Sequence, residues 1–338
     1  MTTATLAPAW PDELTEVFTS SLVCEYATLT RQGRPVTWPV TPYLGGRTLD
    51  VSTGLTYPLK AERARANPRV ALSYSDPAGY ASGSASAAGP PVVLVEGFAT
   101  VRDADLQANT DRYVRESLAK TGTSGTPWFL ARTWGWYYAR IWVEVTPVRV
   151  TWWPEGDLGA EPQVWAAPAD VALPASDPAP APRTGGRTHT GSGGSAPADW
   201  RPFADRAEEL GAPVVTMTRH GAPLPVRART VRRTDDGYVV TLPRGVPPTA
   251  GPVCLTFHRV GEGPHFSQEN VVLLGEGRQD GDSGLTVVVD RAVNDWSVWG
   301  SQLARVRDWF GHGARLKAQL AEEAGRRGQP VPRVRRTP

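Results

Sequence analysis

The side chains that could carry out chemistry are few in this sequence, and they form no recognisable catalytic arrangement. There is no nucleophile with a base and an orienting group, no pair of carboxylates at a fixed spacing and no glycine-rich phosphate loop. Lysine is rare, so Lys60 is conspicuous beside the other two lysines, Lys120 and Lys317. Taken alone, Lys60 is a solvated lysine at the start of a short helix. These residues by themselves identify no reaction.

The cysteines and histidines give no sign of a metal site. Cys24 and Cys254 lie in apolar runs in different halves of the chain, which predicts two buried, reduced thiols. No histidine combines with a cysteine at a zinc-binding spacing. A lone histidine is more often a structural residue than a ligand, and this applies to all five: His189, His220, His258, His265 and His312. We therefore predict no metal site.

The composition excludes several classes of protein. The 338 residues include 36 basic and 34 acidic side chains, so the net charge of +2 gives no electrostatic footprint for nucleic acid. No apolar run approaches the roughly 18–20 residues of a membrane span. The first residues lack the basic start and apolar core of a signal peptide. We expect a globular protein of the cytoplasm.

Length and local composition divide the chain into four segments. At roughly 100–200 residues per domain, the length predicts two domains. We place the first domain at residues 11–155 and the second at 200–298, joined by a flexible linker at 156–199 that is rich in Pro, Gly and Ser. A helical segment at 299–328 follows, and the last residues, 330–338, are predicted to be a disordered tail.

Both domains are predicted to be mainly β. In the first, apolar and β-branched runs predict strands at 23–30, 35–43, 48–53, 69–75, 92–101 and 141–153. In the second, the same pattern predicts strands at 214–218, 224–232, 238–242, 253–258, 271–276 and 285–289. A helix at 59–66 carries Lys60 and ends before Asn67-Pro68, because the residue before a proline disfavours helical backbone. Gly97 marks a possible β-bulge.

Three short matches recur in the same order in both halves. ATLTRQGRPV at 27–36 matches VTMTRHGAPL at 215–224. RVALSY at 69–74 matches PVCLTF at 252–257, and VVLVEG at 92–97 matches VLLGEG at 272–277. Three matches in order indicate two copies of one β-barrel. The copies differ where the first has the Lys60 helix, since the second has only a proline-rich turn at 243–251.

The order of motifs in the first half resembles the split barrels of the pyridoxamine 5'-phosphate oxidase-like superfamily. The resemblance rests on a turn at Gly33-Arg34-Pro35, on Ser52-Thr53, and on Lys60 followed by a short helix into Asn67-Pro68. The pattern at 143–153, VEVTPVRVTWW, completes it. It covers most of residues 14–153, and a weaker version covers about 200–298. It implies tandem split β-barrels with flanking helices.

The resemblance also implies a cofactor, FMN or a related deazaflavin, held in a groove where two barrels meet. The lysine matching Lys60 would meet the cofactor phosphate, with help from Ser52 and Thr53. The main chain of the strand matching Trp38, Pro39, Val40 and Thr41 would lie against the ring. A cation with hydroxyls and backbone N–H groups can hold a phosphate. Some split barrels bind haem through a histidine, which makes His258 and His312 alternative candidates.

The sequence departs from the pyridoxamine-phosphate oxidases at the strand containing Trp38. Those enzymes have basic residues there, whereas this strand reads Trp-Pro-Val-Thr-Pro-Tyr at 38–43. This argues against oxidation of pyridoxamine phosphate itself. Arg227 and Arg229 alternate along a strand of the second half, and we consider that they supply the missing charge if the halves pair. The simpler interpretation is that they face solvent.

The function implied is that of a flavin- or deazaflavin-dependent oxidoreductase acting on a small-molecule substrate. Such a cofactor performs the hydride chemistry itself, which fits the lack of a catalytic motif. A non-catalytic cofactor- or haem-binding protein of the same fold is the alternative. The barrels are expected to pair within one chain as a pseudo-dimer or between two chains as a homodimer.

Overall fold

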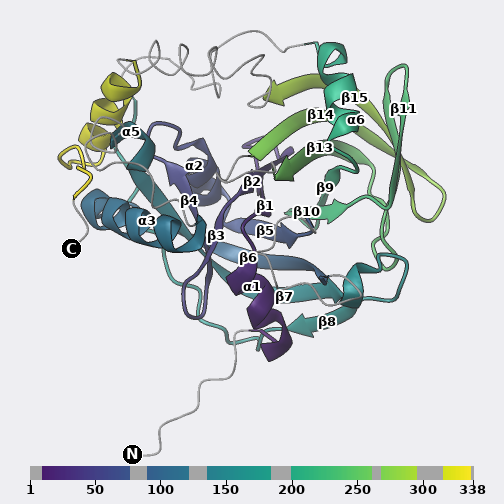
Figure 1. The fold of residues 1–338 in the computed structure, drawn as a ribbon, viewed down its shortest axis with the longest axis horizontal. Helices are drawn as coiled ribbons and strands as arrows, with labels where there is room; N and C mark the ends of the chain where they lie inside the picture. Colours follow the sequence, from purple (N-terminus) through teal and green to yellow (C-terminus); the bar gives the residue numbers. More distant parts are fainter. Residues whose placement is uncertain are drawn as a thin grey trace, which may run out of the picture.

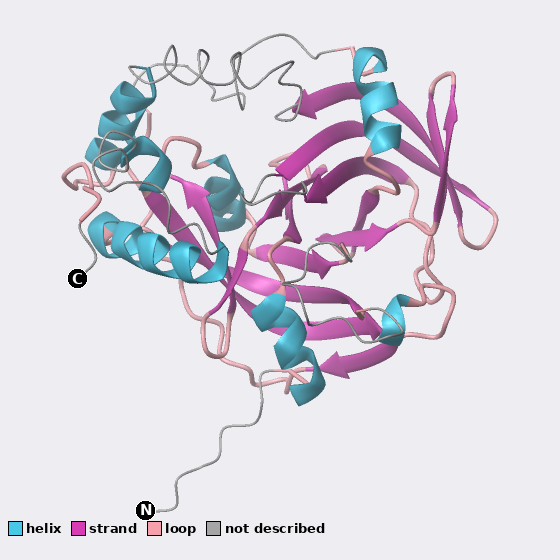
Figure 2. Ribbon diagram, viewed as in Figure 1, coloured by secondary structure: helices cyan, strands magenta, loops and turns pink. Residues whose placement is uncertain are grey.

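The computed structural model describes residues 10–76, 90–121, 135–183, 199–260, 268–294 and 315–335. Two strongly curled antiparallel sheets, one from each half of the chain, make up most of it (Figure 1, Figure 2). The first sheet contains β1 (Cys24–Leu29), β2 (Pro35–Val40), β3 (Pro42–Leu44), β4 (Leu49–Gly54), β5 (Arg69–Tyr74), β6 (Val92–Arg102), β7 (Arg140–Trp153) and β8 (Gln163–Ala166). The second contains β9 (Val214–Arg219), β10 (Ala222–Arg227), β11 (Thr230–Thr234), β12 (Gly237–Thr241), β13 (Gly251–Val260), β14 (Gln268–Asp280) and β15 (Gly284–Asn294).

The strand order shows that the two sheets are copies of one topology. The first sheet runs β2-β1-β5-β6-β7-β4-β3, with β8 added to β7. The second runs β10-β9-β13-β14-β15-β12-β11, which is the same order strand for strand. The predicted repeat is therefore confirmed, and so is the predicted fold class of tandem split barrels.

Most of the helices lie on the first sheet. They are α1 (Thr15–Ser20), which follows the short turn η1 (Asp12–Leu14), then α2 (Leu59–Ala66), α3 (Leu106–Thr121), α5 (Gly135–Tyr138) and a C-terminal helix over residues 315–326. Leu320 and Ala324 of the C-terminal helix are buried in the same apolar core as Ala61 and Ala64 of α2. The second sheet is covered by α6 (Ala204–Glu209), whose Ala204 and Ala207 enter a second core.

The two barrels pack directly against each other. The Thr37 hydroxyl on β2 lies 2.5 Å from the Thr216 hydroxyl on β9, and Thr256 on β13 donates to the carbonyl oxygen of Thr37 at 3.2 Å. Apolar residues of the first barrel, among them Leu94 and Trp153, are buried in the core of the second. The barrels thus share both polar and apolar contacts.

The structure differs from the sequence-based expectation at residues 156–183, the first part of the expected linker. β8 pairs with residues 149–152 of β7, and the Asp177 carboxylate accepts hydrogen bonds from the backbone N–H groups of Asp103 and Ala104, both at 2.8 Å. The chain end differs in the same way, because Arg333 donates its N–H to Gln107 on α3 at 2.9 Å. These segments bury little apolar surface, and hydrogen bonds to the first barrel hold them in place instead.

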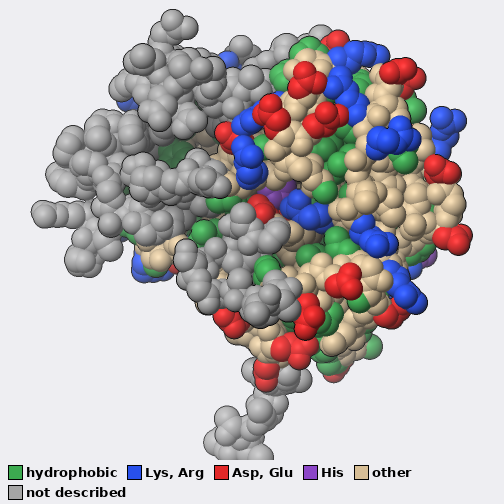
Figure 3. Space-filling model, turned by 45° about the vertical axis from the view of Figure 1, so that its right-hand side comes forward, with side chains coloured by type: hydrophobic (Ala, Val, Ile, Leu, Met, Phe, Trp, Pro, Cys, Tyr) green, Lys and Arg blue, Asp and Glu red, His purple; other side chains and the backbone are tan. Residues whose placement is uncertain are grey.

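Two general properties of the molecule bear on its partners. None of the helices in the described part of the chain is long and apolar enough to cross a membrane. On the face drawn in Figure 3, basic and acidic side chains are interspersed, and neither sign gathers into a continuous patch.

Candidate functional site

Three cationic side chains gather where β4 leads into α2. Lys60 and Arg63 lie one turn apart on α2, and Arg140 is the first residue of β7, the neighbour of β4. The helix forms here because LKAERARA consists of good helix formers. It ends at Asn67, as predicted, because Pro68 disfavours helical backbone before it.

These three cations have no acidic partner in the described part of the chain. Burial lowers the pKa of Lys60 to about 8, and the charges of Arg140 and Arg63 add to that effect. Burial also lowers the pKa of Arg63. Arg63 Nη1 and Arg140 Nε are buried without a hydrogen-bond partner. The cluster therefore carries uncompensated positive charge in a poorly solvated place.

Tyrosine rings, and not carboxylates, hold Arg140. Its guanidinium lies 4.0 Å from the ring centre of Tyr113 and 4.7 Å from that of Tyr137. Its Nη2 donates to the Tyr113 hydroxyl at 2.9 Å. Cation–π contacts orient a guanidinium without neutralising it, so the charge remains available to an anion.

The second barrel forms a wall beside this cluster. Burial raises the pKa of Cys254 on β13 to about 11, and the positive charge of Arg63 works against that rise. Cys254 packs with Val36, Val272 and Leu274, and Trp38 on β2 packs against the same group. Lys60 Nζ lies 5.2 Å from the Trp38 ring centre. An aromatic ring and an apolar wall thus stand next to the three cations.

Ser52 and Thr53 lie on β4 close to the cluster. They pair with Trp142 and Ile141 of β7, immediately before the position of Arg140. The Thr53 hydroxyl donates to the carbonyl oxygen of Tyr57 at 3.0 Å, within the loop that leads to α2. Both residues thus lie one and two positions before Gly54, the partner of Arg140, and the Thr53 proton is already used within the loop; their contact with a cofactor stays a prediction.

The strand predicted to lie against a ring is β2, at the end of the first sheet's strand order. Trp38 contacts Lys60, as described above, whereas Val40 is buried in the core of the first barrel. Pro39 pairs with Glu25 on β1, and Thr41 follows the strand and is half-buried. Contact of Pro39, Val40 and Thr41 with a cofactor remains a prediction.

Arg227 and Arg229 form no bond with Lys60, Arg63 or Arg140 among the described contacts. Arg227 crosses to the first barrel, where its Nη2 lies 3.2 Å from Glu25 Oε1 and its Nε donates to Ser75 Oγ at 3.0 Å. Its charge is therefore matched by a fully buried carboxylate. Arg229 is exposed, with its guanidinium near Gly159.

His258, a candidate haem ligand, belongs to the same buried group as Arg227. Its Nε2 lies 2.7 Å from Glu25 Oε1 and 3.1 Å from Arg227 Nη2, and its side chain is fully buried. Both contacts tie it to the interface between the barrels. The other candidate, His312, lies outside the described residues.

Sequence reasoning missed Arg63, Arg140 and the tyrosines. Arg63 had a usable signal, since it follows Lys60 by three residues on a predicted helix and so shares its face. Arg140 had none, because its approach to Lys60 depends on the pairing of β4 with β7.

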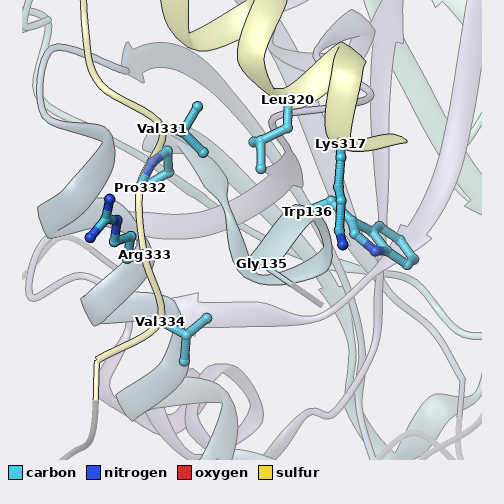
Figure 4. Close-up of a pocket in the computed structure, with 8 residues that line it drawn as sticks. All are labelled: Gly135, Trp136, Lys317, Leu320, Val331, Pro332, Arg333 and Val334. Atoms are coloured by element: carbon cyan, nitrogen blue, oxygen red, sulfur yellow. The ribbon is translucent and has the colours of Figure 1, made fainter. Parts of the chain in front are cut away.

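Two pockets lie away from the cationic cluster. One, of about 270 Å³, opens between α5 and the C-terminal segment, with Trp136 and Lys317 side by side on its wall and Val331–Val334 on the other side (Figure 4). Another, of about 430 Å³, is an open surface hollow around Arg201 and Arg233. Neither touches Lys60, so the cationic cluster is identified by its charges and not by an empty volume.

The second barrel has lost every part of this cluster. Residues 242–250 connect β12 to β13 without a helix, at the place where α2 lies in the first barrel. Gly284 begins β15 and pairs with Thr241, as Arg140 begins β7 and pairs with Gly54. Val246 of that connection is buried in the second core together with Trp153. The one cation of that connection, Arg244, is exposed and ion-paired to Glu161 at 2.9 Å, so the second barrel has no buried, unpaired cluster there among its described residues.

Comparisons with known proteins give matches among solved structures only. No family model matches the chain, and no curated protein matches it. General stress protein 26 from Bacillus anthracis is 13% identical over 46% of this chain and 96% of that chain, with a TM-score of 0.30. An F420 reductase is 18% identical over 42% of this chain and 98% of that chain, with a TM-score of 0.32. A putative pyridoxamine 5'-phosphate oxidase from Listeria innocua is 17% identical over 41% of this chain and 94% of that chain, with a TM-score of 0.28.

The fold itself is read from the strands of this chain. Each half forms one curled antiparallel sheet, and the two sheets have the same strand order. The site helix α2 interrupts this pattern in the first half only. By this topology, the chain folds as two split β-barrels in tandem.

Proposed function

We propose that this protein binds a flavin-type cofactor, FMN or a deazaflavin, with its phosphate at Lys60, Arg63 and Arg140. The observation that carries the proposal is the pair of buried, unpartnered guanidinium nitrogens, Arg63 Nη1 and Arg140 Nε. A buried charge without a partner is strongly destabilising. A phosphate supplies both the opposite charge and the acceptor oxygens that these groups lack.

The surroundings of the cluster suit the rest of such a cofactor. Trp38 and the apolar group around Cys254 offer a flat, dry surface for a ring system. When bound, a flavin or deazaflavin supplies hydride transfer. The residues of this chain would bind the phosphate, orient the ring and exclude water. The proposed activity is therefore an oxidoreductase reaction on a small organic substrate, which the cofactor would carry out.

Titration with FMN, with a deazaflavin and with riboflavin tests the proposal. We expect Lys60→Met and Arg63→Met each to weaken binding of the phosphorylated cofactor about 10- to 100-fold, because a hydrogen bond to a charged group contributes about 1.5–3 kcal/mol. Riboflavin, which has no phosphate, should bind the variants and the wild type equally. Fluorescence of the ring reports all three affinities.

Lys317→Met is the matched control, because Lys317 is exposed on the C-terminal helix and contacts neither Lys60 nor Arg63. Equal affinity of the wild type for FMN and riboflavin would contradict a phosphate site. Reoxidation of the bound, reduced cofactor by small organic acceptors distinguishes an oxidoreductase from a protein that only binds the cofactor.

The asymmetry of the two halves predicts one cofactor for each chain. We propose that the second barrel replaces the partner subunit of a homodimer, since it walls the site through Cys254 and the one cation of its matching connection, Arg244, is exposed and ion-paired to Glu161. Calorimetric titration should give one binding site per chain. A stoichiometry of two would show that the second barrel also binds ligand.

A further inference from the structure

The two charged faces of α2 differ in whether their side chains form ion pairs. Lys60 and Arg63 lie one turn apart, and Glu62 and Arg65 form a second pair with the same spacing. At about 100° per residue, the two pairs lie on opposite sides of the helix. The first pair has no carboxylate partner in the described part of the chain, whereas the second is ion-paired to distant segments.

Glu62 ties α2 to two segments outside the first sheet. Its Oε1 lies 3.1 Å from Arg326 Nη1 of the C-terminal helix and 3.4 Å from Arg183 Nη2. Two hydrogen bonds join Arg326 to Ala181. The Ala181 N–H donates to the Arg326 carbonyl oxygen at 2.9 Å, and Arg326 Nε donates to the Ala181 carbonyl oxygen at 2.8 Å. The two segments therefore hold Glu62 as one unit.

Glu323 is the centre of this unit. Its side chain is 1% exposed and lies 2.9 Å from Arg183, 2.7 Å from Arg326 and 2.8 Å from Arg327. Burial acts to raise the pKa of Glu323, but hydrogen bonds from the three guanidinium groups hold it below its usual value. The carboxylate stays charged and fixes the arginines that reach Glu62.

A second connection runs through Arg65 at the other end of the same face. Its Nη2 lies 2.7 Å from Asp103 Oδ1, and it also donates to the carbonyl oxygen of Asp177. Asp103 Oδ2 in turn lies 2.9 Å from Nε of Arg327. The Nη1 atom of Arg327 lies 2.8 Å from Glu323 Oε2. The network is closed, so α2 is held at both Glu62 and Arg65.

In the ribbon, α2 lies between the C-terminal helix and the sheet of the second half (Figure 1). We infer that Glu62 and Glu323 are positioning residues, through which the C-terminal helix holds α2 so that Lys60 and Arg63 lie towards the second barrel. An eight-residue helix has little rigidity of its own. The mutual repulsion and burial of its cations favour movement towards water, and the ion pairs on the opposite face oppose that movement. The purpose of this arrangement rests on the proposed function, but its test needs no ligand.

The titration of Lys60 reports the position of α2. With three lysines in the chain, reductive methylation with ¹³C-formaldehyde gives few NMR signals, which Lys→Arg variants assign. In Glu62→Gln and Glu323→Gln we expect the pKa of Lys60 to rise from about 8 by about one unit towards its ordinary value of 10.5, because the loosened helix lets Lys60 reach water. The titration of Lys120, whose ammonium donates to the Pro42 carbonyl, should not change.

Asp50→Asn is the matched control for a general loss of stability. Asp50 is also 1% exposed and bonds to Arg112 at 2.6 Å, without contact to α2. It should leave the Lys60 titration unchanged. An unchanged Lys60 pKa in a folded Glu62→Gln variant would overturn the inference. Because the Glu62 side chain is a quarter exposed, its replacement should let the protein fold, so this variant gives the answer even if Glu323→Gln does not fold. Failure of the wild type to bind either FMN or a deazaflavin would refute the proposed function instead.

Discussion

Replacing Arg227 with methionine is expected to lower the free energy of unfolding by about 3–5 kcal/mol, the usual effect of removing one partner of a buried ion pair. Glu25, in the other barrel, is fully buried, and Arg227 and His258 are its charged or ionisable partners at 3.2 and 2.7 Å. Burial acts to raise the pKa of Glu25, and the bonds from His258 and Arg227 hold it below its usual value. Without Arg227, part of that compensation is lost and the buried carboxylate keeps His258 and Ser75 as its partners.

Urea unfolding followed by tryptophan fluorescence measures the effect of Arg227→Met. Arg229→Met is the control, because Arg229 lies two residues further along the chain and is exposed, so its loss should cost less than about 0.5 kcal/mol. Equal stabilities of the two variants would mean that the Glu25 network contributes nothing to the association of the barrels.

Replacing Lys60 with methionine is expected to stabilise the ligand-free protein at pH 7 by about 1–3 kcal/mol, while it weakens cofactor binding. The pKa of Lys60 falls from 10.5 to about 8, so the folded state disfavours its charged form. The expected gain is smaller than the full shift implies, because Lys60 is partly exposed and water screens its charge. Methionine keeps the length of the side chain and removes the buried charge.

The stabilisation by Lys60→Met should depend on pH in a defined direction. Between about pH 8 and 10.5 the unfolded chain keeps the Lys60 proton and the folded protein has released it, so the stability contributed by this group in the wild type rises with pH. The advantage of the variant is therefore largest below pH 8 and disappears above about pH 10.5. Urea unfolding at pH 7 and pH 9.5 measures it, with Lys317→Met as the exposed control. A variant less stable than the wild type at pH 7 would contradict the buried charge.

Local sequence signals predicted most of the strands and the site helix. The predicted helix at 59–66 has the bounds of α2, because its composition and Asn67-Pro68 act locally. Gly97 marks a bulge, as expected: the register shifts there, and a Cβ on Gly97 would lie 2.6 Å from the Thr146 carbonyl oxygen. β7 continues through Pro147, which lies opposite that bulge, where a missing N–H is tolerated.

The errors of prediction fall where distant segments meet. The predicted strand at 224–232 is two strands, β10 and β11, separated at Ala228–Arg229. The ordered segment around Asp177 has few large apolar residues, so its composition does not predict that it packs on the first barrel through the hydrogen bond to Asp103. The same holds for the site, since Lys60 was visible in the sequence while the approach of Arg140 and the pairing of Arg227 with Glu25 depend on strand order and barrel contact.

The loss of α2 from the second barrel has a consequence for how this protein can change. In an assembly of two identical chains, each substitution appears twice, so a change that improves one binding groove also alters the other. Here the two barrels are encoded separately, and a substitution acts once. Under the proposed function, the half with Lys60 and Arg63 is constrained by a ligand, whereas the half with Gly284 and Val246 is constrained by packing. Under the proposed function, the single chain allows one half to serve as the binding domain and the other as its wall.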